Sequence, residues 1–200
     1  MIYLDNAATT YPKPKEVRDA YVLWGCEKCV NAGRGSYRLA AEAERQIQYT
    51  RHTMAEYVHA FSDDDVYFTA SATMAANVIL QGITWNKGDV VVVSPYEHNA
   101  VMRTLHAMQE RYEIQIKVLP VREDGQIDLD KTSTFFQLEK PRLVCVTQVS
   151  NVTGYLLPYA QIFRAAKKTG AVTFLDSAQG LGICPVNVVE EHIDFLIFAG

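Results

Sequence analysis

The stretch TFLDSAQGLG, residues 173–182, decides the fold of this chain. The apolar run from Ala171 to Leu175 is typical of a buried strand. It ends in the carboxylate of Asp176, which the amide of Gln179 soon follows. Ligands bind at the carboxyl ends of strands in open α/β sheets. Asp176 is therefore either a ligand-binding carboxylate or an ordinary cap of the next turn, and the ends of the other strands must decide between the two.

Strands and helices alternate along residues 61–200, which we expect to form a single α/β domain. Apolar or alternating runs predict strands at residues 66–69, 90–94, 114–119, 142–149 and 171–175. Helical patterns with N-terminal caps and C-terminal glycines separate most of these runs. The alternation predicts an α/β fold in which a mostly parallel sheet is covered by helices on both faces.

Residues 1–60 have a different pattern and are expected to form an extended segment followed by helices. The opening YLDNAATTYPKP contains two prolines, which interrupt regular structure. A short helix is predicted from Glu16 to Trp24, and a long amphipathic helix from Leu39 to Phe61. Between them, Arg34 stands between two glycines in NAGRGSYR, where it can reach an anion, although a solvated loop arginine is the more common case.

Polar residues follow four of the predicted strands. In chain order they are Thr73, His98, Asn151 and Asp176. Because the carboxyl ends of parallel strands share one edge of the sheet, we expect these four residues on one rim. Ser71, Ala72 and Thr73 also begin a helix, so their backbone N–H groups either bind a phosphate or receive an ordinary Ser or Thr cap.

The composition excludes several function classes. The net charge of −4, the isoelectric point near 5.7 and the lack of a large basic cluster argue against a nucleic-acid partner. No apolar run approaches the ~20 residues that cross a bilayer, and the N-terminus does not resemble a secretion signal. We therefore expect a cytoplasmic globular protein with no membrane partner.

The cysteines and the glycine patterns point to no common catalytic or metal-binding motif. Cys26 and Cys29 form a CxxC, but no second pair of ligands at metal-binding spacing follows, so we expect no metal site. Cys145 lies in an apolar run and Cys184 stands beside a proline, which is typical of core residues. The sequence contains neither the GxSxG of acyl-transfer enzymes nor a GxGxxG after a strand.

Pyridoxal 5'-phosphate (PLP) suits the groups expected on this rim, which are a phosphate cradle, a flat imidazole ring, amides and a carboxylate. The phosphate of PLP needs a helix N-terminus, its ring needs a stacking face, and its pyridine nitrogen needs an acid partner that keeps it protonated. The chain also resembles the class V aminotransferases, which are PLP-dependent enzymes of fold type I, and within them the cysteine desulfurase-like group. The resemblance is carried, in this order, by YLDNAATT, NAGRG, FTASATMAAN, SPYEHNAV, VSNVTG, FLDSAQ and DFLIFAG.

The resemblance implies a role for each rim residue. His98 would stack on the pyridine ring and Asp176 would pair with the ring nitrogen, and these two would be the catalytic residues. The phosphate would be held by Ala72 and Thr73, and the phenolic oxygen would accept hydrogen bonds from Asn151 and Gln179. The residues expected near the substrate are Asn6, Ala8, Thr9 and Arg34.

The implied reaction converts L-cysteine to L-alanine and passes the sulfur to an enzyme cysteine as a persulfide. The full-length enzyme would be a homodimer that acts on a small amino acid, with cysteine as the favoured substrate. Other class V reactions share these motifs: transamination, selenocysteine cleavage and epimerisation. A third possibility is a non-catalytic fragment that only associates with another chain.

One part of the family pattern is missing. In the family, a His-Lys pair follows the strand that corresponds to DFLIFAG, and its lysine forms the Schiff base with PLP, whereas this sequence stops at Gly200. Lys87, Lys131 and Lys168 follow no strand in that position. We therefore expect the N-terminal portion of the large domain, inactive alone, with the small domain, the substrate-carboxylate arginine and the reactive cysteine lying beyond it.

Overall fold

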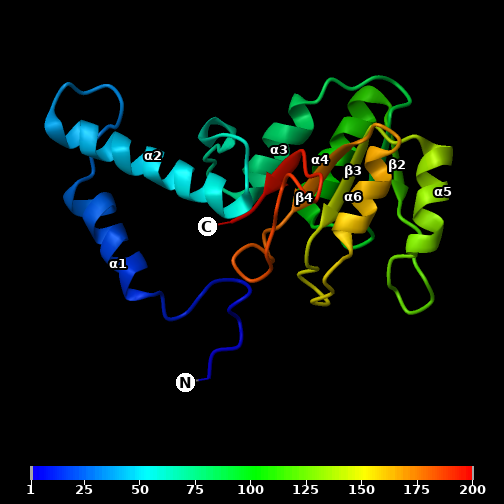
Figure 1. Ribbon diagram of the computed structural model, residues 1–200, viewed down its shortest axis with the longest axis horizontal. Coiled ribbons are helices and arrows are strands. Elements are labelled where there is room, and N and C mark those ends of the chain that lie inside the picture. Colours follow the sequence, from blue (N-terminus) through cyan, green and yellow to red (C-terminus); the bar gives the residue numbers. More distant parts are fainter. Residues whose placement is uncertain (1, 200) are drawn as a thin grey trace. The chain divides into compact units, whose positions relative to one another are not determined.

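Figure 1 shows the computed structural model, which describes residues 2–199 of the chain. The chain divides into two compact units, one ending at Tyr67 and the other beginning at Phe68, and each is described by itself. No helix within residues 2–199 is long and apolar enough to cross a membrane.

A sheet of five parallel strands forms the centre of the second unit, in the order β2-β1-β3-β4-β5. The strands are β1 (Val90–Val93), β2 (Gln115–Val118), β3 (Leu143–Thr147), β4 (Val172–Asp176) and β5 (Phe195–Ile197). The register places Thr147, the last residue of β3, beside Asp176, the last residue of β4. The predicted α/β fold with a parallel sheet is confirmed.

Helices cover both faces of this sheet, as predicted. Alternate residues of a strand point to opposite faces, so Val91 and Val93 of β1 pack in one apolar cluster and Val92 packs in the other. One face is covered by α3 (Ala72–Gly82) and α4 (Asn99–Tyr112), and the other by α5 (Leu129–Glu139) and α6 (Tyr159–Lys167). Both clusters contain fully buried side chains, such as Leu105 and Phe163. The strand ends are therefore fixed by packing from two sides.

The strand order creates a switch point between β1 and β3. The chain leaves β1 through α4 toward β2, and it leaves β3 through α6 toward β4 on the opposite side. In sheets of this type, ligands bind where two such connections diverge, outside the carboxyl ends of the strands. Here, the segments that follow β1 and β3 contain Glu97, His98 and Asn151.

The strand predicted at residues 66–69 is wrong. These residues belong to no strand of the described sheet, and the Arg51 side chain donates a hydrogen bond to the Val66 carbonyl at 3.0 Å. A side chain thus occupies an acceptor that a neighbouring strand would use. Thr73 consequently follows no strand of the sheet. It lies in the first turn of α3, which packs against α4 and contacts β5.

The first unit is built from helices with little buried apolar surface. Its elements are α1 (Lys15–Val22), the π-helix η1 (Leu23–Glu27), α2 (Arg38–Val58) and the 3₁₀-helix η2 (Asp63–Asp65). The predicted end of the first helix near Gly25 is wrong, because a bond from the Lys28 N–H to the Leu23 carbonyl continues it as a π-turn. The long helix ends before the predicted Phe61, at His59, whose φ is 57°. The buried hydrophobic residues of the unit are Ala40, Ala43, Ala55 and Val58.

Candidate active site at the carboxyl edge of the sheet

Asp176 ends β4 as a nearly inaccessible carboxylate, with 4% of its surface exposed. One carboxylate oxygen, Oδ1, accepts a hydrogen bond from the Ala178 backbone N–H at 3.0 Å. Burial raises the pKa of Asp176, while the Ala178 N–H and the neighbouring His98 act in the opposite direction. The hydrogen bond from Ala178 is the local turn cap that was one of the two possibilities for Asp176. However, burying a carboxylate costs far more free energy than a turn cap contributes. The position therefore suits a charged ligand group.

His98 is the N-cap of α4. Its Nδ1 accepts a hydrogen bond from the Ala100 backbone N–H at 3.1 Å, and its own backbone is extended. Because Nδ1 is an acceptor here, the neutral ring carries its proton on Nε2. The cap fixes one edge of the imidazole. The side chain is exposed, so its ring is available to stack on a planar ligand. His98 lies near Asp176, and its ring, when protonated, lowers the pKa of that carboxyl.

Glu97 is a polar residue of this edge that our sequence reasoning did not select. Its Oε1 accepts hydrogen bonds from the Ser94 hydroxyl at 2.5 Å and from the Thr147 backbone N–H at 2.6 Å. Burial, and to a lesser degree the charge of Asp176, raises the pKa of Glu97 to about 8 against the two hydrogen bonds. The available signal was its place in the short segment between a buried strand and His98.

Ala72 and Thr73 lie in the first turn of α3. The N-cap Ser71 accepts from the Met74 N–H at 3.1 Å, and the Ser71 carbonyl accepts from Ala75. Both the helix cap and the phosphate site predicted for this segment therefore have support. Ser71 caps the helix, while the N–H groups of Ala72 and Thr73 have no acceptor among residues 2–199. Free N–H groups at the start of an 11-residue helix form a suitable cradle for an anion.

Asn151 and Gln179 lie in the loops that follow β3 and β4, so both belong to the carboxyl edge. The loop with Gln179 is anchored by the fully buried Gln148, whose Oε1 accepts a hydrogen bond from the Ser177 hydroxyl. Gly180 is required here, because a Cβ at this position would lie 2.0 Å from the Gln148 Oε1. The sequence pattern does not predict this support, because it forms between residues about thirty positions apart.

The residues predicted near the substrate lie in the first unit. Asn6, Ala8 and Thr9 share one turn, in which the Asn6 Oδ1 accepts from the Tyr11 N–H at 3.2 Å and the Ala8 N–H bonds to the Asp5 carbonyl at 3.1 Å. Arg34 is exposed in the loop before α2. The structure thus brings three of the four together in one local turn, and their role stays a prediction.

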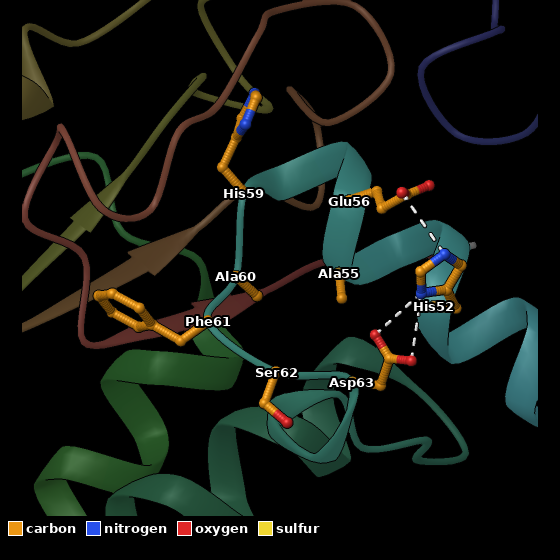
Figure 2. A pocket seen from close by; sticks show the side chains of 8 residues that line it. All are labelled: His52, Ala55, Glu56, His59, Ala60, Phe61, Ser62 and Asp63. Carbon is orange, nitrogen blue, oxygen red and sulfur yellow. Dashed lines mark hydrogen bonds and ion pairs between the residues drawn. The ribbon is translucent and has the colours of Figure 1, made fainter.

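A pocket of about 470 Å³ in the first unit contains none of the predicted site residues (Figure 2). At its wall, the His52 ring lies between two carboxylates, with Nδ1 3.2 Å from Asp63 and Nε2 3.4 Å from Glu56. The contact with Asp63 connects α2 to η2, whereas Glu56 lies on α2 itself, one turn from His52. Within residues 2–199 no group of three or more His, Cys, Asp or Glu residues is arranged to hold a metal ion, and Cys26 and Cys29 are exposed free thiols.

Comparison with known proteins gives one consistent result. The sequence profile of the family described as Aminotransferase class-V matches residues 2–200. A cysteine desulfurase of Pectobacterium atrosepticum is 32% identical over 203 residues, and a probable cysteine desulfurase of Methanothermobacter thermautotrophicus is 34% identical over 199 residues. Both comparisons cover 100% of this chain and 49% of the relative.

Solved structures agree with the sequence comparison. The apo structure of a cysteine desulfurase from Thermococcus onnurineus NA1 matches with a TM-score of 0.90 at 28% identity. The match covers 98% of this chain and 49% of the other. The chain thus spans about half the length of the curated relatives it matches.

Proposed function

Because this chain belongs to the class V aminotransferase family, we propose that it is the PLP-binding portion of a cysteine desulfurase. The complete enzyme would convert L-cysteine to L-alanine and pass the sulfur to a cysteine thiolate as a persulfide. The relatives favour this reaction over the other class V reactions, since those named above are cysteine desulfurases or probable cysteine desulfurases. Cysteine is accordingly the proposed substrate.

The observation that carries the proposal is the buried carboxylate of Asp176, which lies near His98 and has no lysine or arginine partner among residues 2–199. Asp176 is 4% exposed, and no Lys or Arg side chain among residues 2–199 forms an ion pair with it. A buried carboxylate without a cation is expensive unless a ligand supplies the positive charge. The protonated pyridine nitrogen of PLP is a charge of this kind, so the donor set fits the cofactor.

Two further features fit the same group. The unpaired N–H groups of Ala72 and Thr73 suit a phosphate dianion. Asn151 and Gln179, in loops of the same edge, would donate hydrogen bonds to the phenolic oxygen. When bound, PLP supplies an electron sink for the bonds around the α-carbon of the amino acid. Asp176 would hold the proton on the ring nitrogen, and His98 would hold the ring in its plane.

The remaining parts of the proposal concern the whole enzyme. Substrate contacts would come from Asn6, Ala8, Thr9 and Arg34. The enzyme would be cytoplasmic, as expected from the sequence, and a homodimer, as the family resemblance implies. The resemblance also assigns the covalent bond with PLP to a lysine beyond Gly200, so binding to these 200 residues would be non-covalent.

The experiment for the chain is a PLP titration followed by borohydride reduction and peptide mass analysis. We expect saturable binding that Asp176→Asn weakens about tenfold or more, while the matched control Asp130→Asn, an exposed carboxylate paired with Arg122, leaves binding unchanged. We expect no selective lysine adduct and no desulfurase turnover. A stoichiometric adduct on one lysine, together with turnover, would show that an internal lysine carries the cofactor.

The reaction itself is tested in a protein of the full length of the relatives. With cysteine as substrate, equal amounts of alanine and transferred sulfur are expected. Asp176→Asn should lower the rate about 30- to 1,000-fold, since a charge-assisted hydrogen bond in a dry site contributes roughly 2–4 kcal/mol. Unchanged turnover in Asp176→Asn would remove this residue from the reaction, and turnover of another amino acid in place of cysteine would favour a different class V activity.

A further inference from the structure

Glu97 connects the two strands that border the switch point. It follows β1, and its Oε1 accepts one hydrogen bond from Ser94, at the end of β1, and one from the backbone N–H of Thr147, the last residue of β3. Ser94 and Thr147 are themselves buried. The side chain therefore joins the carboxyl ends of β1 and β3 at the position from which His98 starts α4.

The two oxygens of this carboxyl have unequal surroundings. Oε1 receives two donors, whereas Oε2 is buried without a hydrogen-bond partner among residues 2–199. An ionised carboxyl would leave negative charge on a buried oxygen with no donor, which is far more costly than burying a neutral group. A proton on Oε2 removes the charge and leaves both bonds to Oε1 intact, so only a neutral O–H group is buried without a partner among residues 2–199.

The titratable groups around Glu97 favour the same state. Asp176 on β4 acts on Glu97 as a like charge, and burial raises the pKa of the Cys145 thiol of β3. Two further titratable residues flank Glu97 in the chain: Tyr96, and His98 at the start of α4, which acts on Asp176. With Glu97 neutral, Asp176 is the one negative charge that these groups present to a ligand.

We propose that Glu97 is a positioning residue that, as a neutral acid, joins β1 to β3 and so holds His98 in place beside Asp176. The part that concerns PLP rests on the function proposed above. Two roles follow from one side chain. It fixes the backbone from which the imidazole projects, and it leaves the charge of Asp176 free of a competing anion.

The conservative variant Glu97→Gln keeps both features. Its amide oxygen can accept the bonds from Ser94 and Thr147, and its amide nitrogen stands where Oε2 carries the proton. Glu97→Ala removes both acceptor bonds and leaves the Thr147 N–H without its partner. A neutral-acid role thus predicts rescue by glutamine, whereas a role that needs a carboxylate charge predicts none.

The first test is infrared spectroscopy of the 200-residue chain without cofactor. We expect a carbonyl band of a protonated carboxylic acid at neutral pH that disappears in Glu97→Gln. The band should persist in Asp176→Asn and in Glu123→Gln, an exposed control. A wild-type chain without this band, or a band that Glu97→Gln leaves in place, would overturn the neutral-acid assignment.

The second test compares PLP binding. We expect the Glu97→Gln dissociation constant to stay within about twofold of wild type and that of Glu97→Ala to rise about tenfold. If Glu97→Ala does not fold, the dissociation constant of Glu97→Gln alone tests the positioning role. Loss of binding in Glu97→Gln with the fold intact would overturn the positioning role. Absence of PLP binding by the wild-type chain would instead refute the proposed function, while the infrared result still decides the state of Glu97.

Discussion

The carboxylates at the two edges of the parallel sheet have different kinds of partner. At the amino edge, Asp89 before β1 pairs with Arg142 before β3 at 3.3 Å, and Asp194 before β5 pairs with Lys167 at the end of α6. At the carboxyl edge, Asp176 and Glu97 accept hydrogen bonds from neutral groups, and within residues 2–199 neither pairs with a lysine or arginine.

We infer that this difference separates structural carboxylates from the one proposed to bind a ligand. Asp194 also accepts a hydrogen bond from the backbone N–H of the buried Thr173 at 2.8 Å, so this carboxylate has both a cation and a backbone donor of β4 as partners. Asp176 is buried without a compensating cation, and burial raises its pKa. An edge that retains uncompensated buried acids is organised for a ligand at some cost in stability.

The largest expected effect is a loss of stability as the pH rises. The pKa of Glu97 is raised in the folded chain from 4.5 to about 8, so the folded state holds a proton that the unfolded state releases across this range. The free energy of unfolding should therefore fall by about 2–4 kcal/mol between pH 5 and pH 8. Urea titrations at several pH values measure it, and Glu97→Gln should remove most of the slope. A flat profile in the wild type would contradict the burial of this acid.

The next effect belongs to the amino edge. Asp194→Ala should lower the free energy of unfolding by about 1–3 kcal/mol, because the Thr173 N–H loses its acceptor and Lys167 loses its partner. Urea denaturation measures the change. Lys167→Ala serves as the control that removes the ion pair alone, and it should cost about 1 kcal/mol or less, since both partners are partly exposed. Equal losses in the two variants would contradict the role given to Thr173.

A smaller effect of opposite sign is expected at the carboxyl edge. Asp176→Asn should leave the cofactor-free chain equally stable or about 1 kcal/mol more stable above pH 5, because a buried charge is removed. The raised pKa of Asp176 means that this gain grows with pH and vanishes in acid. Thermal unfolding at pH 5 and pH 8 gives the comparison. Destabilisation as large as that of Asp194→Ala would erase the distinction between the two edges.

The smallest effect is expected away from both edges. Replacing Cys26 and Cys29 with serine should change the free energy of unfolding by less than about 0.5 kcal/mol, since both are exposed. Metal content by mass spectrometry and PLP affinity should also stay the same. Stoichiometric zinc that is lost in the double variant would show that these thiols bind a metal.

The sequence was informative where local pattern and tertiary structure agree. The apolar runs before Ser94, Gln148 and Ser177 are long enough to identify buried strands, so the polar residues after them could be assigned to the carboxyl edge. The run at residues 66–69 has the same local pattern but no neighbouring strand, because Arg51 occupies the Val66 carbonyl. The hydrophobic pattern of a segment alone does not show whether a neighbouring strand is present to pair with it.

The role of Glu97 could not be read from its neighbours in the sequence. Beside His98 it resembles a solvated acid, and its burial depends on Thr147, fifty positions away, which only the pairing of β1 with β3 brings near. The same holds for Gln148 and Ser177, whose bond follows from the pairing of β3 with β4. Long-range strand pairing creates these environments, whereas single residues and their spacing do not.

The central claim is that Asp176 meets the pyridine nitrogen of PLP at this edge. The most direct measurement is the ¹⁵N resonance of PLP labelled at that nitrogen, recorded bound to the wild-type chain, to Asp176→Asn and to the Asp130→Asn control. We expect a protonated nitrogen in the wild type and the control, and a deprotonated one in Asp176→Asn at the same pH. The same resonance in wild type and Asp176→Asn would contradict the account.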